Sequence, residues 1–182
     1  CLSGVPEQVA LLLECGADSA AVDANGQNAL HASAVFLSSD KARLDAVILV
    51  DMLVRAGVSA TAADVHQQTP LHLLCGAALQ KGQVLKEGLV LSAIDRLLRE
   101  SPDIDAADAR GFSALHHCAA RGYGQLVDCL LQAGADKHRR DNLGRSASDF
   151  AVMGGFSEVA NRLQDRPERV DIASLLNKKD QA

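Results

Sequence analysis

The sequence has very few aromatic residues. It contains no tryptophan, one tyrosine and four phenylalanines, which together make up 3% of its 182 residues. Flat aromatic surfaces on which bases or sugars stack are therefore scarce. Basic residues are outnumbered as well, since 18 lysines and arginines against 23 aspartates and glutamates give a formal charge of −5. Nucleic-acid binders usually carry an excess of lysine and arginine, so direct binding of nucleic acid is not expected.

Long apolar runs and leader signals are also missing. No stretch of about 18 uninterrupted apolar residues occurs, and no basic segment followed by an apolar one begins the chain, so membrane insertion is not expected. The five scattered cysteines favour free thiols in a reducing compartment, the cytoplasm first and the nucleus second. Residue 1 is Cys and not Met, from which we expect a monomeric domain cut from a longer chain.

Internal repetition is what the sequence does contain, on a hydrophobic content of 48%. The most regular copy begins Asp-Ala-Arg-Gly-Phe-Ser-Ala-Leu-His at Asp108 and ends Gly-Ala-Asp at Gly134. An earlier copy begins at Asp64 and contains Thr-Pro-Leu-His at 69–72. Another begins at Asp23 and contains Asn-Ala-Leu-His.

The two outermost copies are incomplete. Residues 4–18 match only the second half of the pattern, so the first helix of that copy is expected to be missing or truncated. The last copy begins at Asp141 and carries Asp149 in place of the histidine. Its second half is more polar than the inner copies, which is expected of the end of a stack that must stay soluble.

The spacing of the copies tests this alignment. The residue that closes the second helix of each copy recurs at Gly16, Gly57, Ser101 and Gly134. The intervals between these numbers are 41, 44 and 33 residues, against a period of about 33. The second and third copies therefore carry insertions of 8 and 11 residues, placed between their two helices at 37–44 and 78–88.

Motif, period and polar end together resemble the ankyrin repeat. The resemblance implies an all-α solenoid of stacked helix-turn-helix units joined by short β-turn loops, elongated and slightly curved. The expected domain covers residues 1–166 and divides into a partial repeat (1–22), two repeats with insertions (23–63 and 64–107), a regular repeat (108–140) and a capping repeat (141–166). A polar tail follows at 167–182, with one short helix expected at 170–176.

Most motif residues have a structural role to fill. Thr69 is suited to cap a helix that begins at Pro70, because its hydroxyl accepts a backbone N–H and proline has none to lose. Glycines that close helices suit a left-handed conformation. By resemblance, His31, His72 and His116 hydrogen-bond neighbouring backbone and link successive repeats.

Catalysis and metal binding are not expected. His116, His117 and Cys118, with Cys129 nearby, invite a zinc hypothesis, but no Cys-x-x-Cys pair is present to begin a tetrahedral site. The sequence has no Gly-x-Ser-x-Gly elbow, phosphate loop or dinucleotide fingerprint. We therefore expect no enzyme activity, no metal and no cofactor, and interpret Cys118 and Cys129 as buried small apolar residues.

Binding is expected on the concave face of loop tips and first helices. By resemblance, the contact residues there include Asn25, His66, Arg110, Phe112, Arg121, Leu143, Arg145 and Met153. Lys137, Arg139 and Arg140 lie in the turn between repeats 4 and 5 and add to a local basic patch in an acidic chain. Two interpretations of this patch stay open, a solvated turn and a site for carboxylates or phosphates.

The expected function is a protein-protein interaction module that scaffolds, recruits or inhibits an acidic or phosphorylated protein partner. Two alternatives stay open. The chain is a substrate-docking or regulatory segment of a larger enzyme, or it inhibits a transcription factor in the manner of the NF-κB inhibitor branch of the ankyrin family.

Overall fold

The computed structural model describes residues 5–38, 44–76, 84–100 and 103–164. Within these ranges the chain forms nine α-helices and no strand, apart from one isolated bridge between Arg140 and Ser146. The predicted all-α repeat stack is confirmed. The tail at 167–182, its expected helix, and the centres of both insertions, at 39–43 and 77–83, lie outside the described residues.

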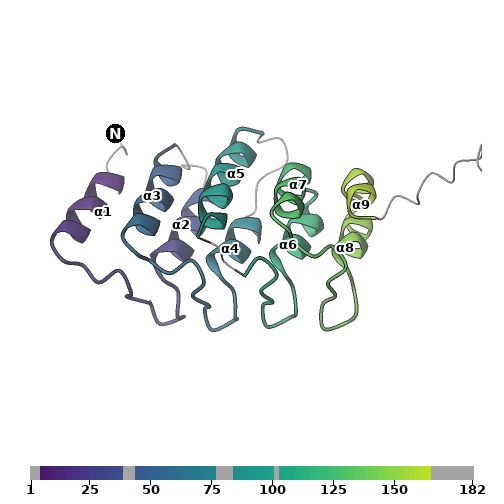
Figure 1. The fold of residues 1–182 in the computed structure, drawn as a ribbon, viewed down its shortest axis with the longest axis horizontal. Coiled ribbons are helices and arrows are strands. Elements are labelled where there is room, and N and C mark those ends of the chain that lie inside the picture. Colours follow the sequence, from purple (N-terminus) through teal and green to yellow (C-terminus); the bar gives the residue numbers. More distant parts are fainter. Residues whose placement is uncertain (1–4, 39–43, 77–83, 101–102, 165–182) are drawn as a thin grey trace, which may run out of the picture.

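The helices stand side by side in two layers along one elongated stack, with every loop between repeats projecting to the same side (Figure 1). The first-helix layer contains α2 (Ala29–Ser38), α4 (Pro70–Gly76), α6 (Ala114–Arg121) and α8 (Ala147–Met153). The second-helix layer contains α1 (Val5–Glu14), α3 (Leu44–Arg55), α5 (Val84–Leu98), α7 (Gly124–Gln132) and α9 (Ser157–Leu163). Repeat 1 contributes only α1 to the described part, which packs on α3.

The core is one aliphatic cluster that runs between the two layers. Val50 of α3, Ile94 of α5 and Leu126 of α7 are fully buried, and small side chains such as Ala119 let the first helices approach closely. Each helix buries one stripe against the neighbouring repeats, so no repeat has a separate core. The stack is therefore stabilised mainly by contacts between repeats.

Helices of the second layer end as predicted. Gly16, Gly57 and Gly134 have φ values of +84°, +80° and +97°, the left-handed region that other residues enter only at a steric cost. The chain turns there and runs into the next projecting loop. The equivalent Ser101–Pro102 turn lies outside the described residues.

Each projecting loop is held by the aspartate that begins its repeat. One carboxylate oxygen of Asp108 accepts hydrogen bonds from the backbone N–H groups of Arg110 (2.8 Å) and Phe112 (2.9 Å). Aspartates 23, 64 and 141 form the same pair of bonds in their own loops. Backbone hydrogen bonds then join each loop tip to the next, including one from the N–H of Asn142 to the carbonyl of Arg110 (3.2 Å). The row of tips is therefore a connected structure.

The three motif histidines link successive repeats, as predicted. Nε2 of His31 lies 2.9 Å from the carbonyl oxygen of Gln68, and Nε2 of His72 lies 3.0 Å from those of Ala106 and Phe112. His116 makes the equivalent contact with Arg145 (3.2 Å). In His72 and His116, Nδ1 accepts a backbone N–H from the ring's own repeat, so we assign to these two rings the neutral tautomer that carries its proton on Nε2. Nδ1 of His31 lies close to both the backbone N–H (3.2 Å) and the side-chain carbonyl oxygen (2.8 Å) of Asn28.

At the start of α4 the hydroxyl of Thr69 lies 2.8 Å from Nδ1 of His72, and the backbone N–H of Thr69 donates to the same ring nitrogen (3.1 Å). The threonine therefore fixes the ring that bonds to the next repeat. The helix after the second insertion is long: α5 has 15 residues where α7 has nine.

We predict that Gly111→Ala destabilises the chain more than Gly144→Ala. Both glycines have a positive φ, +81° and +78°, so each alanine meets a left-handed penalty of about 1–2 kcal/mol. A Cβ at Gly111 would also lie 2.7 Å from the backbone nitrogen of Asn142, whereas nothing lies within 4 Å at Gly144. Urea unfolding of both variants measures the difference, and equal losses of stability would contradict the close packing of the two tips.

Candidate functional site

The predicted contact residues of the loop tips are exposed. Asn25, His66 and Arg110 lie at successive tips, and Leu143 at the next tip exposes 75% of its surface. Met153, at the end of α8, is 69% exposed. Apolar side chains as open as these are available to a partner and contribute little to the core.

Aromatic rings gather between the tips and the first helices of repeats 4 and 5. The ring centroid of Phe112 lies 4.9 Å from that of Phe150 and 5.6 Å from that of His117, both in edge-on geometry. It also stacks on His116 at 6.0 Å. Edge-on and offset pairs of this kind stabilise one another beyond the area that they bury. Phe150 and His117 were missed in the sequence because both follow the motif position directly.

The guanidinium group of Arg145 binds other side chains of the protein. Its guanidinium forms an ion pair with Asp141, with Nε and one terminal nitrogen at 2.8 and 2.7 Å from the same carboxylate oxygen. The guanidinium carbon also lies 4.5 Å from the ring centroid of Phe150, a cation–π distance. Since the carboxylate of Asp141 is fully buried, this arginine mainly braces the last loop.

Arg110 and Arg121 differ from Arg145 in that both are exposed and, within the described residues, have no ion pair or side-chain hydrogen bond. Arg110 lies at the loop tip two residues before Phe112, and Arg121 lies one helical turn after His117. Together with aromatic and apolar side chains of repeats 4 and 5 they make up what we call the tip surface: Arg110, Phe112, Arg121, Leu143, Phe150 and Met153.

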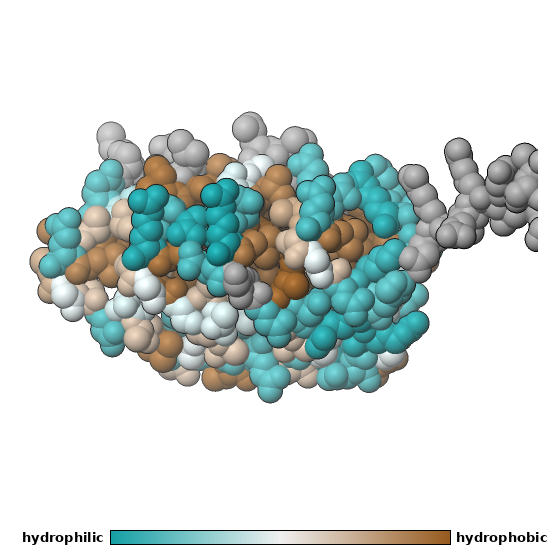
Figure 2. Space-filling model, in the orientation of Figure 1, coloured by the Kyte–Doolittle hydropathy of each residue, from teal (hydrophilic) through white to brown (hydrophobic). Residues whose placement is uncertain are grey.

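The basic side chains of residues 137–140 do not all lie on one surface. Lys137 and Arg140 line a polar pocket beside α8 and α9. Arg139 is half-buried, and its Nε atom is buried without a hydrogen-bond partner in the described part of the chain. The pKa of His116 is lowered first by burial and to a smaller degree by the charge of Arg139. Figure 2 shows hydrophilic residues gathered over the loops of repeats 4 and 5. The predicted basic patch is therefore divided between the tip surface and this pocket.

His117 and Asp108 form a half-buried pair behind the tip surface. Nε2 of His117 lies 3.3 Å from a carboxylate oxygen of Asp108. Burial, and then the nearby charge of His72, lower the pKa of His117 to about 4. Burial would raise the pKa of Asp108, but backbone hydrogen bonds from Phe112 and Arg110 and the adjacent His117 outweigh it and lower that pKa. At neutral pH the ring is therefore uncharged and the carboxylate ionised.

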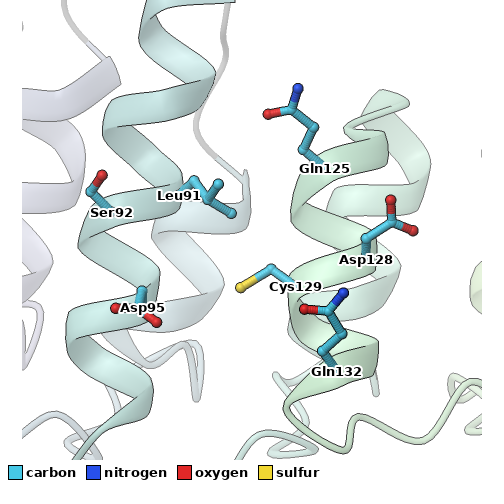
Figure 3. Close-up of a pocket in the computed structure, with 7 residues that line it drawn as sticks. All are labelled: Leu91, Ser92, Asp95, Gln125, Asp128, Cys129 and Gln132. Atoms are coloured by element: carbon cyan, nitrogen blue, oxygen red, sulfur yellow. The ribbon is translucent and has the colours of Figure 1, made fainter.

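A groove separates α5 from α7 in the second-helix layer, away from the loop tips (Figure 3). Its volume is about 570 Å³. Leu91 and Cys129 point toward each other across it, and polar side chains surround them: Ser92, Asp95, Gln125, Asp128 and Gln132. This groove was not predicted from the sequence, and the prediction that Cys129 is buried is only half right, because its side chain is partly exposed.

The arrangement of the described residues does not support the zinc hypothesis. Among the described residues, no three His, Cys, Asp or Glu side chains converge on a point that would suit a metal ion. Cys75 and Cys118 are buried, and burial raises the pKa of Cys129, so that thiol is a weaker nucleophile than an ordinary one. The helices described are each too short or too polar to cross a membrane.

These features define a class of protein: a solenoid of paired helices with a connected row of exposed loop tips. Comparison with known proteins identifies the family. A profile of three successive ankyrin repeats matches residues 82–174, about half of the chain. The chain belongs to the ankyrin-repeat family.

Three relatives match most of this chain. The E3 ubiquitin-protein ligase KEG of Arabidopsis thaliana is 30% identical over 79% of this chain and 8% of its own length. The B-cell lymphoma 3 protein homolog of Mus musculus is 29% identical over 74% of this chain and 34% of its own. An L-asparaginase of Dirofilaria immitis is 29% identical over 95% of this chain and 27% of its own. The chain thus spans about a third or less of these relatives.

We predict that His117 makes the chain less stable as the pH falls from about 7 to about 4. Because the folded ring has a pKa of about 4 and an unfolded histidine one of 6.5, the unfolded state binds more protons in this window, which lowers the free energy of unfolding by up to about 3 kcal/mol.

His117→Leu removes this titration, so its urea midpoint should fall less than that of the wild type between about pH 7.5 and 4.5, a range above the ordinary carboxyl values. Burial also lowers the pKa values of His72 and His116, so a smaller slope of the same sign should remain. Parallel curves for the two proteins would refute the role assigned to His117.

Proposed function

We propose that the chain is a non-catalytic protein-interaction module that scaffolds, recruits or inhibits a protein partner. The family is one of protein-binding repeats, which supports the general assignment. In this proposal the partner binds the tip surface of repeats 4 and 5 and presents acidic or phosphorylated groups there.

The observation that carries this proposal is the pair of exposed arginines in repeat 4, Arg110 and Arg121, that form no ion pair within the described residues. Their guanidinium groups are therefore available to a ligand. Guanidinium groups bind carboxylates and phosphates through paired, charge-assisted hydrogen bonds. The aromatic side chains and the open Leu143 and Met153 of the same tip surface supply apolar anchors of the kind that dominate interfaces.

The tip surface is also well prepared for binding. Asp108 holds the tip that carries Arg110 and Phe112, and Arg145 is braced between Asp141 and Phe150. A surface that is already ordered loses less conformational entropy when it binds than a flexible loop does. His66 and Asn25 lie on the same bonded row of tips and extend the proposed contact toward repeats 3 and 2.

A second candidate is a substrate-docking or regulatory segment of a larger enzyme. It is favoured by the names of relatives such as the ubiquitin ligase and the L-asparaginase, of which the matched segment is only a small part. In that case the tip surface would hold the enzyme's substrate or regulator. The other alternative, that the chain inhibits a transcription factor, stays a prediction.

We predict that Arg110→Glu and Arg121→Glu each weaken binding of acidic ligands about tenfold or more, since each loses an attraction and gains a repulsion. Peptides would first be selected by the wild-type chain from a library that contains acidic, phosphorylated and neutral sequences. Fluorescence anisotropy then gives their affinities for each variant from about 50 to about 300 mM salt.

Arg99→Glu is the matched control, because Arg99 is an exposed arginine of the second-helix layer that pairs with Asp95. It should leave the affinities unchanged within about twofold. Selection of neutral peptides, or equal losses for all three variants, would rule out the proposed surface.

A further inference from the structure

Arginines join neighbouring second helices at two junctions of the stack. Nε of Arg96 in α5 donates to Oδ1 of Asp51 in α3 (2.6 Å). Arg162 of α9 forms an ion pair with Asp128 of α7 and also donates to the carbonyl oxygen of Gly124 (3.1 Å). In both pairs the aspartate belongs to one second helix and the arginine to the next.

The junction between α5 and α7 has a cysteine where the other two have the arginine. Cys129 follows Asp95 by 34 residues, the same separation that joins Arg162 to Asp128. Burial, and then the negative charge of Asp95, raise the pKa of Cys129, so the thiol is near the carboxylate and is uncharged at neutral pH. The groove of about 570 Å³ between α5 and α7 is lined by both side chains (Figure 3).

Asp95 otherwise has the arrangement of Asp51. Oδ2 of Asp51 binds Arg55, four residues further along the same helix (2.8 Å), and its Oδ1 binds Arg96. Oδ2 of Asp95 likewise binds Arg99 (2.8 Å), but its Oδ1 has no partner among the described residues. Asp51 shows that an aspartate paired within its own helix still binds a second arginine. The Arg99–Asp95 pair is also exposed, so water screens it strongly.

The rest of the groove suits a guanidinium group on an aliphatic stem. The charged side chains among its described lining residues are both aspartates, Asp95 and Asp128. Leu91 supplies apolar surface on which the methylene groups of a long side chain can pack. The amides of Gln125 and Gln132 have no hydrogen-bond partner in the described part of the chain. Their oxygens can accept hydrogen bonds from the N–H groups that one carboxylate oxygen leaves unbound.

We propose that this groove receives an arginine side chain of a protein partner, whose guanidinium binds Oδ1 of Asp95 and the amides of Gln125 and Gln132. The partner thereby supplies the ion pair that Arg96 and Arg162 form at the other two junctions. Arginine suits the groove better than lysine, because its planar fork can bond a carboxylate and an amide oxygen at once. This contact goes beyond the proposed function, since it lies away from the loop tips and takes a cation.

The experiment selects peptides from a random library with the wild-type chain, after the library has been depleted on Cys129→Arg. This variant supplies the missing arginine from the chain itself and should fill the groove. Gln125→Arg, at an exposed position of the lining, replaces it in the depletion if thermal melts show that Cys129→Arg is not folded. The selected peptides should be enriched in arginine over lysine, and should shift the backbone amides of residues 91–95 and 125–132 in NMR spectra. Peptides without arginine enrichment, or shifts confined to the loop tips, would overturn the proposal.

A double-mutant cycle tests the contact with Asp95. Asp95→Asn should weaken a selected peptide about tenfold, because a charge-assisted hydrogen bond becomes a neutral one. Citrulline, which has the shape of arginine without its charge, should weaken the wild-type complex by a similar factor when it replaces the arginine of the peptide. The two changes together should cost little more than either alone, since both remove the same contact. Fully additive losses would assign the arginine to another place on the chain.

Asp51→Asn is the matched control, because it removes an aspartate of the second-helix layer that binds arginines of its own chain and does not line the groove. It should leave the affinity unchanged within about twofold. Cys129→Ser keeps a short neutral side chain and should also bind normally. Equal losses for Asp51→Asn and Asp95→Asn would refute the groove as the site. Acidic peptides selected on the tip surface should bind all these variants alike, so a failure here leaves the proposed function standing.

Discussion

The structure depends on a buried imidazole that is hydrogen-bonded on both sides. Nε2 of His31, His72 and His116 lies against a carbonyl oxygen of the next repeat, and Nδ1 lies against the residue that precedes the ring's own helix. In His72 and His116 only the neutral ring can satisfy both sides, because a protonated Nδ1 would face a backbone N–H donor. An unpaired polar group in this position would be costly. Each ring therefore fixes the offset between two repeats.

That offset is what places the loop tips. In each tip turn, one carboxylate oxygen of the first aspartate accepts hydrogen bonds from two backbone N–H groups. The partner of the other carboxylate oxygen differs from repeat to repeat. In Asp64 it accepts from Gln27 of the preceding repeat (3.1 Å), and in Asp108 it faces His117. In Asp141 it binds Arg145. The same turn therefore contacts a neighbouring tip in one repeat, a first helix in another and an arginine of its own loop in a third. The side chains around each tip differ in this way while the backbone of the turn stays the same.

The sequence predicted features that depend on short-range patterns. Helix pairs, left-handed glycines and histidine links follow from the period and from residue types, and the structure contains them. It did not predict where each cation would lie. Residues 137–140 are adjacent in the sequence, but Lys137 and Arg140 line the polar pocket beside α8 and α9 and Arg139 does not. The position of the Arg145 side chain depends on its contact with Phe150, and the groove at Cys129 depends on how α5 and α7 pack. Both are contacts between elements, which the spacing of residues in the sequence does not determine.

The fifth repeat shows how one substitution changes the hydrogen bonds of a first helix. Among the described residues no repeat follows α9, so a histidine at position 149 would find no carbonyl there for its Nε2–H. Asp149 instead bonds back to Ser146 and closes the first turn of α8. The exchange satisfies the start of the helix and places an ionised carboxylate in the wall of the polar pocket, which Lys137 and Arg140 also line. The residue that replaces the linking histidine therefore also changes the charge of the surface beside it.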